Sequence, residues 1–250
     1  EVNGFDNLNA LKTALKKSQT KIKAYQIYYD ESQKDSLMDG FISHFNEKAT
    51  VNLESGIICD LVNQGECSNC DWFGVFSWKV RDKIKGFDFE RLNDVTAKSG
   101  EYDVLAANPR NCMPEILPTG PYNIRELHVE IWPPMDMLLR KLQQASIIPT
   151  KKRGYMWKKK NYIYCNFFLA KKDIYLDYVE SLLKPAIDLF QTDGELNKLG
   201  MKAPNTQYDN PPQRFVDHTG LTQYPHIPFV LERLINVYVE AKSIKVGYAL

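Results

Sequence analysis

Short β-rich runs alternate with segments of helical periodicity along most of the chain, and this alternation narrows the possible folds more than any other feature. The first run, Ala24–Tyr29, is predicted as a core strand that leads into the polar residues Asp30-Glu31-Ser32. Three further strands are predicted, at Asp71–Ser77, Glu101–Ala107 and Tyr162–Leu169. Strands that alternate with helices form mainly parallel sheets with helices on their faces. We therefore expect an α/β fold with a mixed, mainly parallel sheet.

The intervening segments carry apolar residues at helical spacing. Helices are predicted at Phe5–Lys23, Phe89–Ser99, Glu126–Ile148 and Lys172–Phe190, with a helical or helix-to-strand pattern at Phe229–Lys242. Prolines interrupt two of them: Pro133-Pro134 must break its helix or start a new one at Met135, and Pro185 is expected to cause a kink. Ser55–Leu61 fits a short strand or a helix, and Ala203–Thr222 is predicted as a loop.

The length and composition suit one folded domain. The chain has 250 residues, of which 44% are hydrophobic and 25% charged, so it can bury a sizeable core. No internal repeat or low-complexity linker divides it. We expect an N-terminal helical extension at residues 1–23 and a single α/β domain at residues 24–250.

Charge and cysteine content restrict the partners and the compartment. The formal net charge of +1 gives no overall attraction for nucleic acid, and no nucleic-acid partner is expected. Five cysteines, an odd number, favour reduced thiols in a cytoplasmic protein over a disulfide scaffold. The Cys67-Ser-Asn-Cys70 motif lacks the second Cys or His pair of a zinc site. The N-terminal residues also lack a signal-peptide pattern.

Basic residues gather in two places. Lys79, Arg81 and Lys83 follow a predicted strand, where they would either grip a diphosphate or form the solvated start of a helix. The second place is Lys151–Tyr164, where basic and aromatic residues interleave. That pattern favours a solvated face, but it also fits single-stranded nucleic acid, an anionic ligand or a lipid surface.

Glu232 is the candidate acid–base residue. It follows a loop rich in proline and aromatic residues, where a carboxylate beside a pocket can act as a general base. The alternative is an ordinary ion pair with Arg233 on the surface of a helix. The four histidines do not share helical i, i+4 spacing, and the nucleotide-binding and hydrolase motifs GxGxxG, the P-loop and GxSxG are absent.

The order of five short motifs resembles that of the GT-A-like glycosyltransferases of bacterial capsule and O-antigen synthesis. The motifs are Tyr25-Gln-Ile-Tyr-Tyr-Asp30, Phe73-Gly-Val-Phe-Ser-Trp-Lys79, Glu101-Tyr-Asp-Val-Leu105, Tyr164-Cys-Asn-Phe-Phe-Leu-Ala-Lys-Lys172 and Phe229-Val-Leu-Glu-Arg-Leu-Ile-Asn236. The resemblance spans about residues 24 to 240. It implies a GT-A-like, Rossmann-like fold and the transfer of a sugar from a nucleotide-sugar donor to a glycan acceptor.

The resemblance also implies roles for individual residues. Glu232 matches the glutamate of the family's Glu-Arg-Leu motif, in a region where inverting members can place the catalytic base. The other implied positions would bind the donor: Tyr28, Tyr29 and Asp30 after the first strand, Ser77, Trp78, Lys79 and Arg81 after the second, Asn108 after the third, and Asn166 in the fourth.

The chain departs from the family where metal-dependent members carry Asp-x-Asp. It has Phe76-Ser-Trp-Lys79 at that place, so no metal ligand is predicted and metal dependence should be weak or absent. Lys79 and Arg81 would then stabilise the leaving diphosphate. No cofactor other than the nucleotide-sugar co-substrate is expected.

The missing carboxylate pair also supports an alternative function. The domain would then be a non-catalytic, transferase-like module that binds a glycan or a protein partner. For either function, the expected location is the cytoplasm, with Lys151–Lys160 as a candidate contact with the inner membrane or with an assembly.

Overall fold

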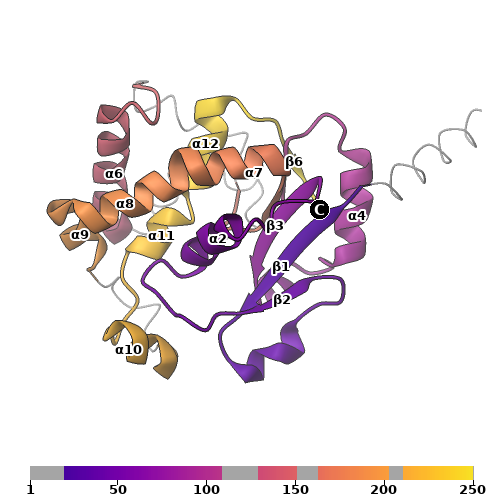
Figure 1. The fold of residues 1–250 in the computed structure, drawn as a ribbon, viewed down its shortest axis with the longest axis horizontal. Coiled ribbons are helices and arrows are strands. Elements are labelled where there is room, and N and C mark those ends of the chain that lie inside the picture. Colours follow the sequence, from indigo (N-terminus) through magenta and orange to yellow (C-terminus); the bar gives the residue numbers. More distant parts are fainter. Residues whose placement is uncertain (1–19, 109–128, 151–162, 203–210, 250) are drawn as a thin grey trace, which may run out of the picture.

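The computed structural model describes residues 20–108, 129–150, 163–202 and 211–249. Its centre is a six-stranded sheet in the order β2-β1-β3-β5-β4-β6 (Figure 1). The strands are β1 (Ile22–Tyr28), β2 (Ile42–Phe45), β3 (Trp72–Ser77), β4 (Val104–Ala106), β5 (Phe168–Lys171) and β6 (Val246–Tyr248). The expected α/β class with a mixed, mainly parallel sheet is confirmed.

One strand, β5, runs against both of its neighbours. The pairs β1–β2, β1–β3 and β4–β6 are parallel, whereas β3–β5 and β4–β5 are antiparallel. The residues that lead into β5 therefore lie at the same edge of the sheet as the carboxyl ends of β1 and β3. In open α/β sheets, that edge is where ligands bind.

Side chains alternate between the two faces of the sheet and belong to two separate clusters of buried residues. Phe73 and Val75 pack in the larger cluster, and Trp72 and Phe76 pack in the smaller one. The smaller cluster includes α3 (Val80–Lys83) and α4 (Phe89–Lys98). In Figure 1, α4 lies on one side of the sheet and α2 and α7 lie on the other.

The larger cluster holds most of the helices. They are α2 (Glu54–Asn63), α6 (Trp132–Gln144), α7 (Lys172–Tyr178), η5 (Val179–Leu183), α8 (Lys184–Thr192), α9 (Gly194–Gly200), α11 (Ile227–Leu231) and α12 (Leu234–Lys242). Helix α10 (Gln213–Thr219) and the short 3-10 turns η1 (Glu31–Ser36) and η3 (Val129–Ile131) complete the described elements. None of the helices in the described ranges is both long and apolar enough to cross a membrane.

The predicted strand Tyr162–Leu169 is largely wrong, because β5 begins only at Phe168 and continues to Lys171. The chain before it is irregular, and Cys165 has a left-handed φ of 51°. Asn236 takes the place of a neighbouring strand: its Oδ1 accepts from the Ile163 amide at 2.8 Å, and its Nδ2 donates to the Ile163 carbonyl at 3.0 Å. The buried side-chain amide of Asn236 thus makes the backbone hydrogen bonds that a neighbouring strand would make if this segment were part of the sheet.

The prolines act differently from the expected kinks. Pro133 and Pro134 lie in the first turn of α6, where their missing amide hydrogens are tolerated, and the helix begins at Trp132 rather than Met135. The predicted helix Lys172–Phe190 is present, but Val179–Leu183 forms a π-helical turn just before Pro185. A widened turn of this kind accommodates a residue that cannot make the normal helical hydrogen bond.

Several elements differ from the sequence prediction. Ser55–Leu61 belongs to helix α2, and α10 lies within the predicted loop Ala203–Thr222. The strands β2 and β6 were not predicted. The predicted helix Phe5–Lys23 falls mostly outside the described residues. Its last two residues, Ile22 and Lys23, belong to β1, so the first strand begins two residues before the expected start at Ala24. Lys151–Lys160 lies wholly outside the described residues.

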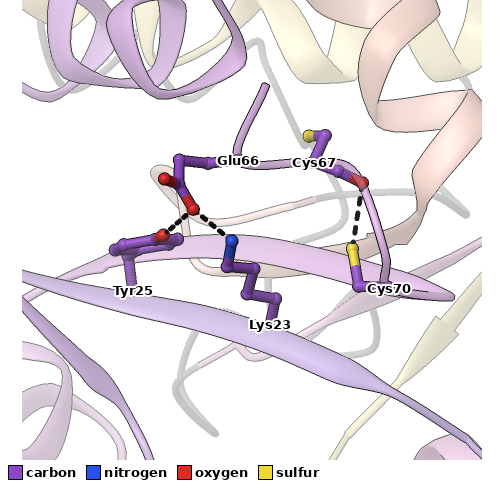
Figure 2. A network of polar contacts seen from close by, with 5 residues as sticks. All are labelled: Lys23, Tyr25, Glu66, Cys67 and Cys70. Carbon is purple, nitrogen blue, oxygen red and sulfur yellow. Dashed lines mark hydrogen bonds and ion pairs between the residues drawn. The ribbon is translucent and has the colours of Figure 1, made fainter. Parts of the chain in front are cut away.

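The Cys67-Ser-Asn-Cys70 segment lies in the connection from α2 to β3 (Figure 2). Both cysteines are buried, and the Cys70 thiol donates to the Cys67 carbonyl at 3.2 Å. Next to them, the Glu66 carboxylate accepts from the Lys23 ammonium and the Tyr25 hydroxyl of β1. These contacts attach the connection to β1, which gives the segment a structural role.

Candidate functional site

A cavity of about 360 Å³ opens at the carboxyl ends of β1 and β3. Its lining comes from segments far apart in the sequence, which the sheet topology brings to this edge. The lining residues are Tyr29, Gln33, Leu53, Glu54, Ser77, Trp78, Lys79, Lys83, Cys165, Asn166, Phe167, Pro212, Tyr224, Phe229 and Glu232. The volume is within the usual range of small-molecule sites.

Most of the predicted site residues meet in this cavity. Six of them line it: Tyr29, Ser77, Trp78, Lys79, Asn166 and Glu232. They come from the ends of β1 and β3, from the turn before β5 and from the junction of α11 and α12. This placement establishes their proximity, whereas their roles in binding and catalysis stay predictions.

The remaining four predicted residues lie outside the lining. Tyr28 packs its ring on Phe45 of β2, with ring centroids 5.0 Å apart. Asp30 is exposed and caps η1, where its carboxylate accepts from the backbone and hydroxyl of Ser32. Neither residue therefore forms a wall of the cavity, because consecutive residues after a strand point in different directions.

Arg81 and Asn108 also lie outside the lining of the cavity. Arg81 is exposed on α3. Asn108 is only 1% exposed, and its Oδ1 accepts from the Tyr164 amide at 2.9 Å. Asn108 thus fixes the backbone of the segment that carries Cys165 and Asn166 into the cavity.

The cationic side of the cavity consists of Lys79 and Lys83. The Lys83 amide donates to the Lys79 carbonyl at 3.1 Å, so one helical turn places both side chains on the same face. Lys79 lies over the Trp78 ring at 5.1 Å, and Lys83 lies over the Phe167 ring at 5.3 Å. The sequence prediction chose Lys79 and Arg81, but helical spacing would have selected Lys83.

Glu232 lies at a break in the chain rather than within a continuous helix. Helix α11 ends at Leu231 and α12 begins at Leu234, so Glu232 and Arg233 form the junction. The Arg233 guanidinium donates to the Phe229 carbonyl and lies 3.8 Å from the Glu232 carboxylate. The Glu232 side chain is 19% exposed, which is enough to reach a ligand in the cavity.

Two opposing effects act on the protonation of Glu232. Burial and the nearby Glu54 carboxylate raise the pKa of Glu232, while Arg233 and Lys83 offset part of that increase. The Cys165 thiol, whose own pKa is raised mainly by burial, adds a further stabilising contact to the Glu232 carboxylate. A raised pKa makes a carboxylate a better proton acceptor near neutral pH.

Glu54 was not among the predicted site residues. It occupies the first turn of α2, after Leu53, which has an unusual φ of 44° and provides no side-chain cap. The surrounding sequence carried few structural signals, and its helix lacks the capping residue that normally marks a helix start. No sequence feature could have placed Glu54 beside Glu232.

A second cavity, of about 540 Å³, lies between β2, α2 and α8. Its lining includes His44, Asn46, Asp60 and Gln191, and none of the predicted site residues contributes to it. The cavity at the ends of β1 and β3 is therefore the candidate site.

Comparison with known proteins adds little to this geometry. No family model matches the sequence, and no curated protein is significantly similar to it. One solved structure, described as the WbbM bifunctional glycosyltransferase in its apo form, is similar with a TM-score of 0.38 and 12% identity. The match covers 92% of this chain and 44% of that protein, so the chain spans less than half of its length. We base no argument on a likeness of this degree.

Proposed function

We propose that the chain transfers a sugar from a nucleotide-sugar donor to a glycan acceptor in surface polysaccharide synthesis. The observation that carries this proposal is the convergence of the motifs that resemble GT-A glycosyltransferases. Four of the five motifs deliver a side chain to one cavity, and only Glu101–Leu105 does not. The cavity that they share lies at the edge of the sheet where open α/β folds bind their ligands.

Glu232 is the proposed catalytic base. Its carboxylate would take the proton from an acceptor hydroxyl while that oxygen attacks the anomeric carbon of the donor sugar. The bond from the anomeric carbon to the diphosphate breaks, and the nucleoside diphosphate leaves with the electron pair. The pKa of Glu232, raised mainly by burial, suits this proton transfer.

Lys79 and Lys83 are the proposed partners of the diphosphate. Both line the cavity, and fixed positive charge beside a leaving group stabilises the negative charge that it gains. Trp78 offers an aromatic surface next to them, and Asn166 offers an amide. These side chains would replace the charge that a metal ion provides in other transferases.

Metal independence belongs to this proposal because Ser77-Trp-Lys79 occupies the place of Asp-x-Asp. Within the described ranges, no group of three or more His, Cys, Asp or Glu side chains is placed to hold a metal ion. The proposed location is the cytoplasm, and contact with the inner membrane or an assembly through Lys151–Lys160 is part of the same proposal.

A non-catalytic module that binds a glycan or a protein partner is the second candidate. It is favoured by the same missing carboxylate pair after β3. The two candidates differ in whether the cavity binds a nucleotide, because a module without transferase activity has no need of the donor.

The test is a melting-temperature screen with uridine, guanosine and cytidine nucleotides and their sugar conjugates. A ligand that binds only the folded state raises the melting temperature, and 100-fold saturation contributes about 2.7 kcal/mol. Slow hydrolysis of the stabilising nucleotide sugar, lost in Glu232→Gln, would support catalysis. A protein that no nucleotide or nucleotide sugar stabilises would contradict sugar transfer and favour the binding module.

A further inference from the structure

Glu54 contributes a second carboxylate to the cavity, and it does so without an ion pair among the described residues. Glu232 differs, because Arg233 lies 3.8 Å from its carboxylate and Lys83 also lowers its pKa. A carboxylate can accept several hydrogen bonds, so Glu54 keeps acceptor capacity for a ligand in the cavity. A partly buried carboxylate gains most from a ligand that donates hydrogen bonds to it.

The neighbours of Glu54 are hydroxyl groups rather than cations. Burial and the Glu54 carboxylate raise the pKa of Tyr224 to about 12, and the same two causes raise the pKa of Tyr29. The Tyr29 hydroxyl oxygen is buried beside Glu54, without a hydrogen bond of good geometry in the described part of the chain. Both tyrosines line the cavity together with Glu54, so three oxygen-bearing side chains that act on one another contribute to its lining.

This group of Tyr29, Glu54 and Tyr224 differs chemically from the two lysines of the lining. Lys79 and Lys83 suit phosphate oxygens, whereas a carboxylate and two tyrosine hydroxyls suit a ligand rich in hydroxyl groups. The backbone before Glu54 is unusual as well, because Leu53 adopts a φ of 44° that only glycine adopts easily. Strained residues of this kind gather where a fold holds a side chain in a functional position.

We propose that Glu54 binds a hydroxyl group of the acceptor sugar beside Glu232, and that the group of Tyr29, Glu54 and Tyr224 takes a neutral sugar rather than a uronic acid. That the bound sugar is the acceptor rests on the proposed function, but the sugar-binding role of Glu54 can be measured without any donor. A sugar carboxylate placed at Glu54 would meet a like charge that has no paired cation.

The experiment is saturation-transfer NMR at pH 7 on the full chain. The probes are methyl glycosides of glucose, galactose and mannose, each compared with the methyl glycoside of its uronic acid. Three proteins are used: wild type, Glu54→Gln and Glu195→Gln. Glu195 is the matched control because it is an exposed glutamate in the first turn of α9, outside the cavity lining.

For at least one pair, the wild type should bind the neutral glycoside about tenfold or more tightly than the uronide, as expected for like charges. Glu54→Gln should reduce this preference to within about twofold, because the repelling charge is gone. Glu195→Gln should retain it. A preference that survives in Glu54→Gln, equal binding of both members of every pair, or binding of no glycoside would each overturn the proposal.

A second measurement covers a Glu54→Gln protein that fails to fold. Titration of the wild type with the preferred neutral glycoside should shift the Glu54 backbone amide signal and leave that of Glu195 in place. An unshifted Glu54 signal would overturn the proposal. If glycosides bind through Glu54 but no nucleotide raises the melting temperature, the sugar-binding role stands and sugar transfer is wrong.

Discussion

Glu54 in the first turn of α2 and Glu232 at the junction of α11 and α12 line the same cavity, and the charge of Glu54 contributes to the raised pKa of Glu232. The Glu232 side chain is only 19% exposed. Two carboxylates that share a site disfavour each other's ionised form, and this coupling is how many enzymes adjust the proton affinity of a base.

Replacing Glu232 should abolish turnover while leaving nucleotide binding intact. Glu232→Gln keeps the shape of the side chain but removes the proton acceptor, so we expect transfer or donor hydrolysis to fall by about 10²–10⁴-fold. The Kd for the nucleoside diphosphate, measured by titration calorimetry, should differ from that of the wild type by less than about threefold, because the lysines remain. Full turnover in Glu232→Gln would show that another group accepts the proton.

The pH dependence of the rate should follow the Glu232 carboxyl group. Because the base must be deprotonated, the rate should fall as the pH drops through the raised pKa of Glu232. Glu54→Gln removes a negative charge, so it should lower that pKa and move the acid limb of the rate profile to lower pH. An acid limb that stays in place would contradict the coupling, and Glu195→Gln provides the baseline.

The same shift makes a prediction about stability. A carboxyl group with a folded pKa above its unfolded value contributes stability below the unfolded pKa, and this contribution is lost as the pH rises through the folded pKa. At pH 8, Glu232→Gln should therefore melt above the wild type. A gain of about 1 kcal/mol in the free energy of unfolding would raise the melting temperature by about 2–4 °C in a chain of this size. Near pH 4 the difference should disappear. A lower melting temperature for Glu232→Gln at pH 8 would contradict this prediction.

Lys79 and Lys83 should carry the affinity for the diphosphate. Each alanine substitution should weaken binding of the nucleoside diphosphate by about tenfold, the value typical of one charged hydrogen bond. Arg81→Ala is the matched control, because Arg81 lies on the same short helix but outside the cavity lining. Titration calorimetry at two salt concentrations would test the effect, and an equal loss in Arg81→Ala would contradict it.

Glu66 should stabilise the fold without affecting the site. A hydrogen bond from Lys23 lowers the pKa of Glu66 most, and a hydrogen bond from Tyr25 lowers it further. The contribution of Glu66 to the stability of the fold is therefore present above the unfolded pKa and is lost as the pH falls through the folded pKa. Its side chain is 33% exposed, so after solvent screening Glu66→Gln should cost about 1 kcal/mol or less at pH 7. Urea unfolding at pH 7 and pH 3 would measure the cost, and a loss that persists at pH 3 would contradict it.

The sequence could predict two strands of the sheet because they are β-rich runs that are buried on both faces. Ala24–Tyr29 and Asp71–Ser77 correspond to β1 and β3, the centre of the parallel part of the sheet. Tyr162–Leu169 misled the prediction because its composition suits a strand equally well. Only the folded structure brings Asn236 alongside Ile163, and that contact replaces the strand pairing.

The site could be predicted in part, for a related reason. Tyr29 and Ser77 follow strands, so their place at the edge of the sheet follows from topology alone. Arg81 and Lys83 could be told apart only by treating Lys79–Lys83 as one helical turn. Glu54 was beyond reach, because its position depends on the conformation of Leu53 and on a junction between two helices much later in the chain.

The reversed direction of β5 has a consequence for the newly made protein. The cavity draws on residues from Tyr29 to Glu232, and the chain must place β5 between β3 and β4 before Asn166 can join the lining. Domains fold as units while the ribosome delivers them from the N-terminus. A nascent chain that stops before α11 therefore holds both lysines and Glu54 but no complete site, so ligand binding can begin only after Glu232 has been added.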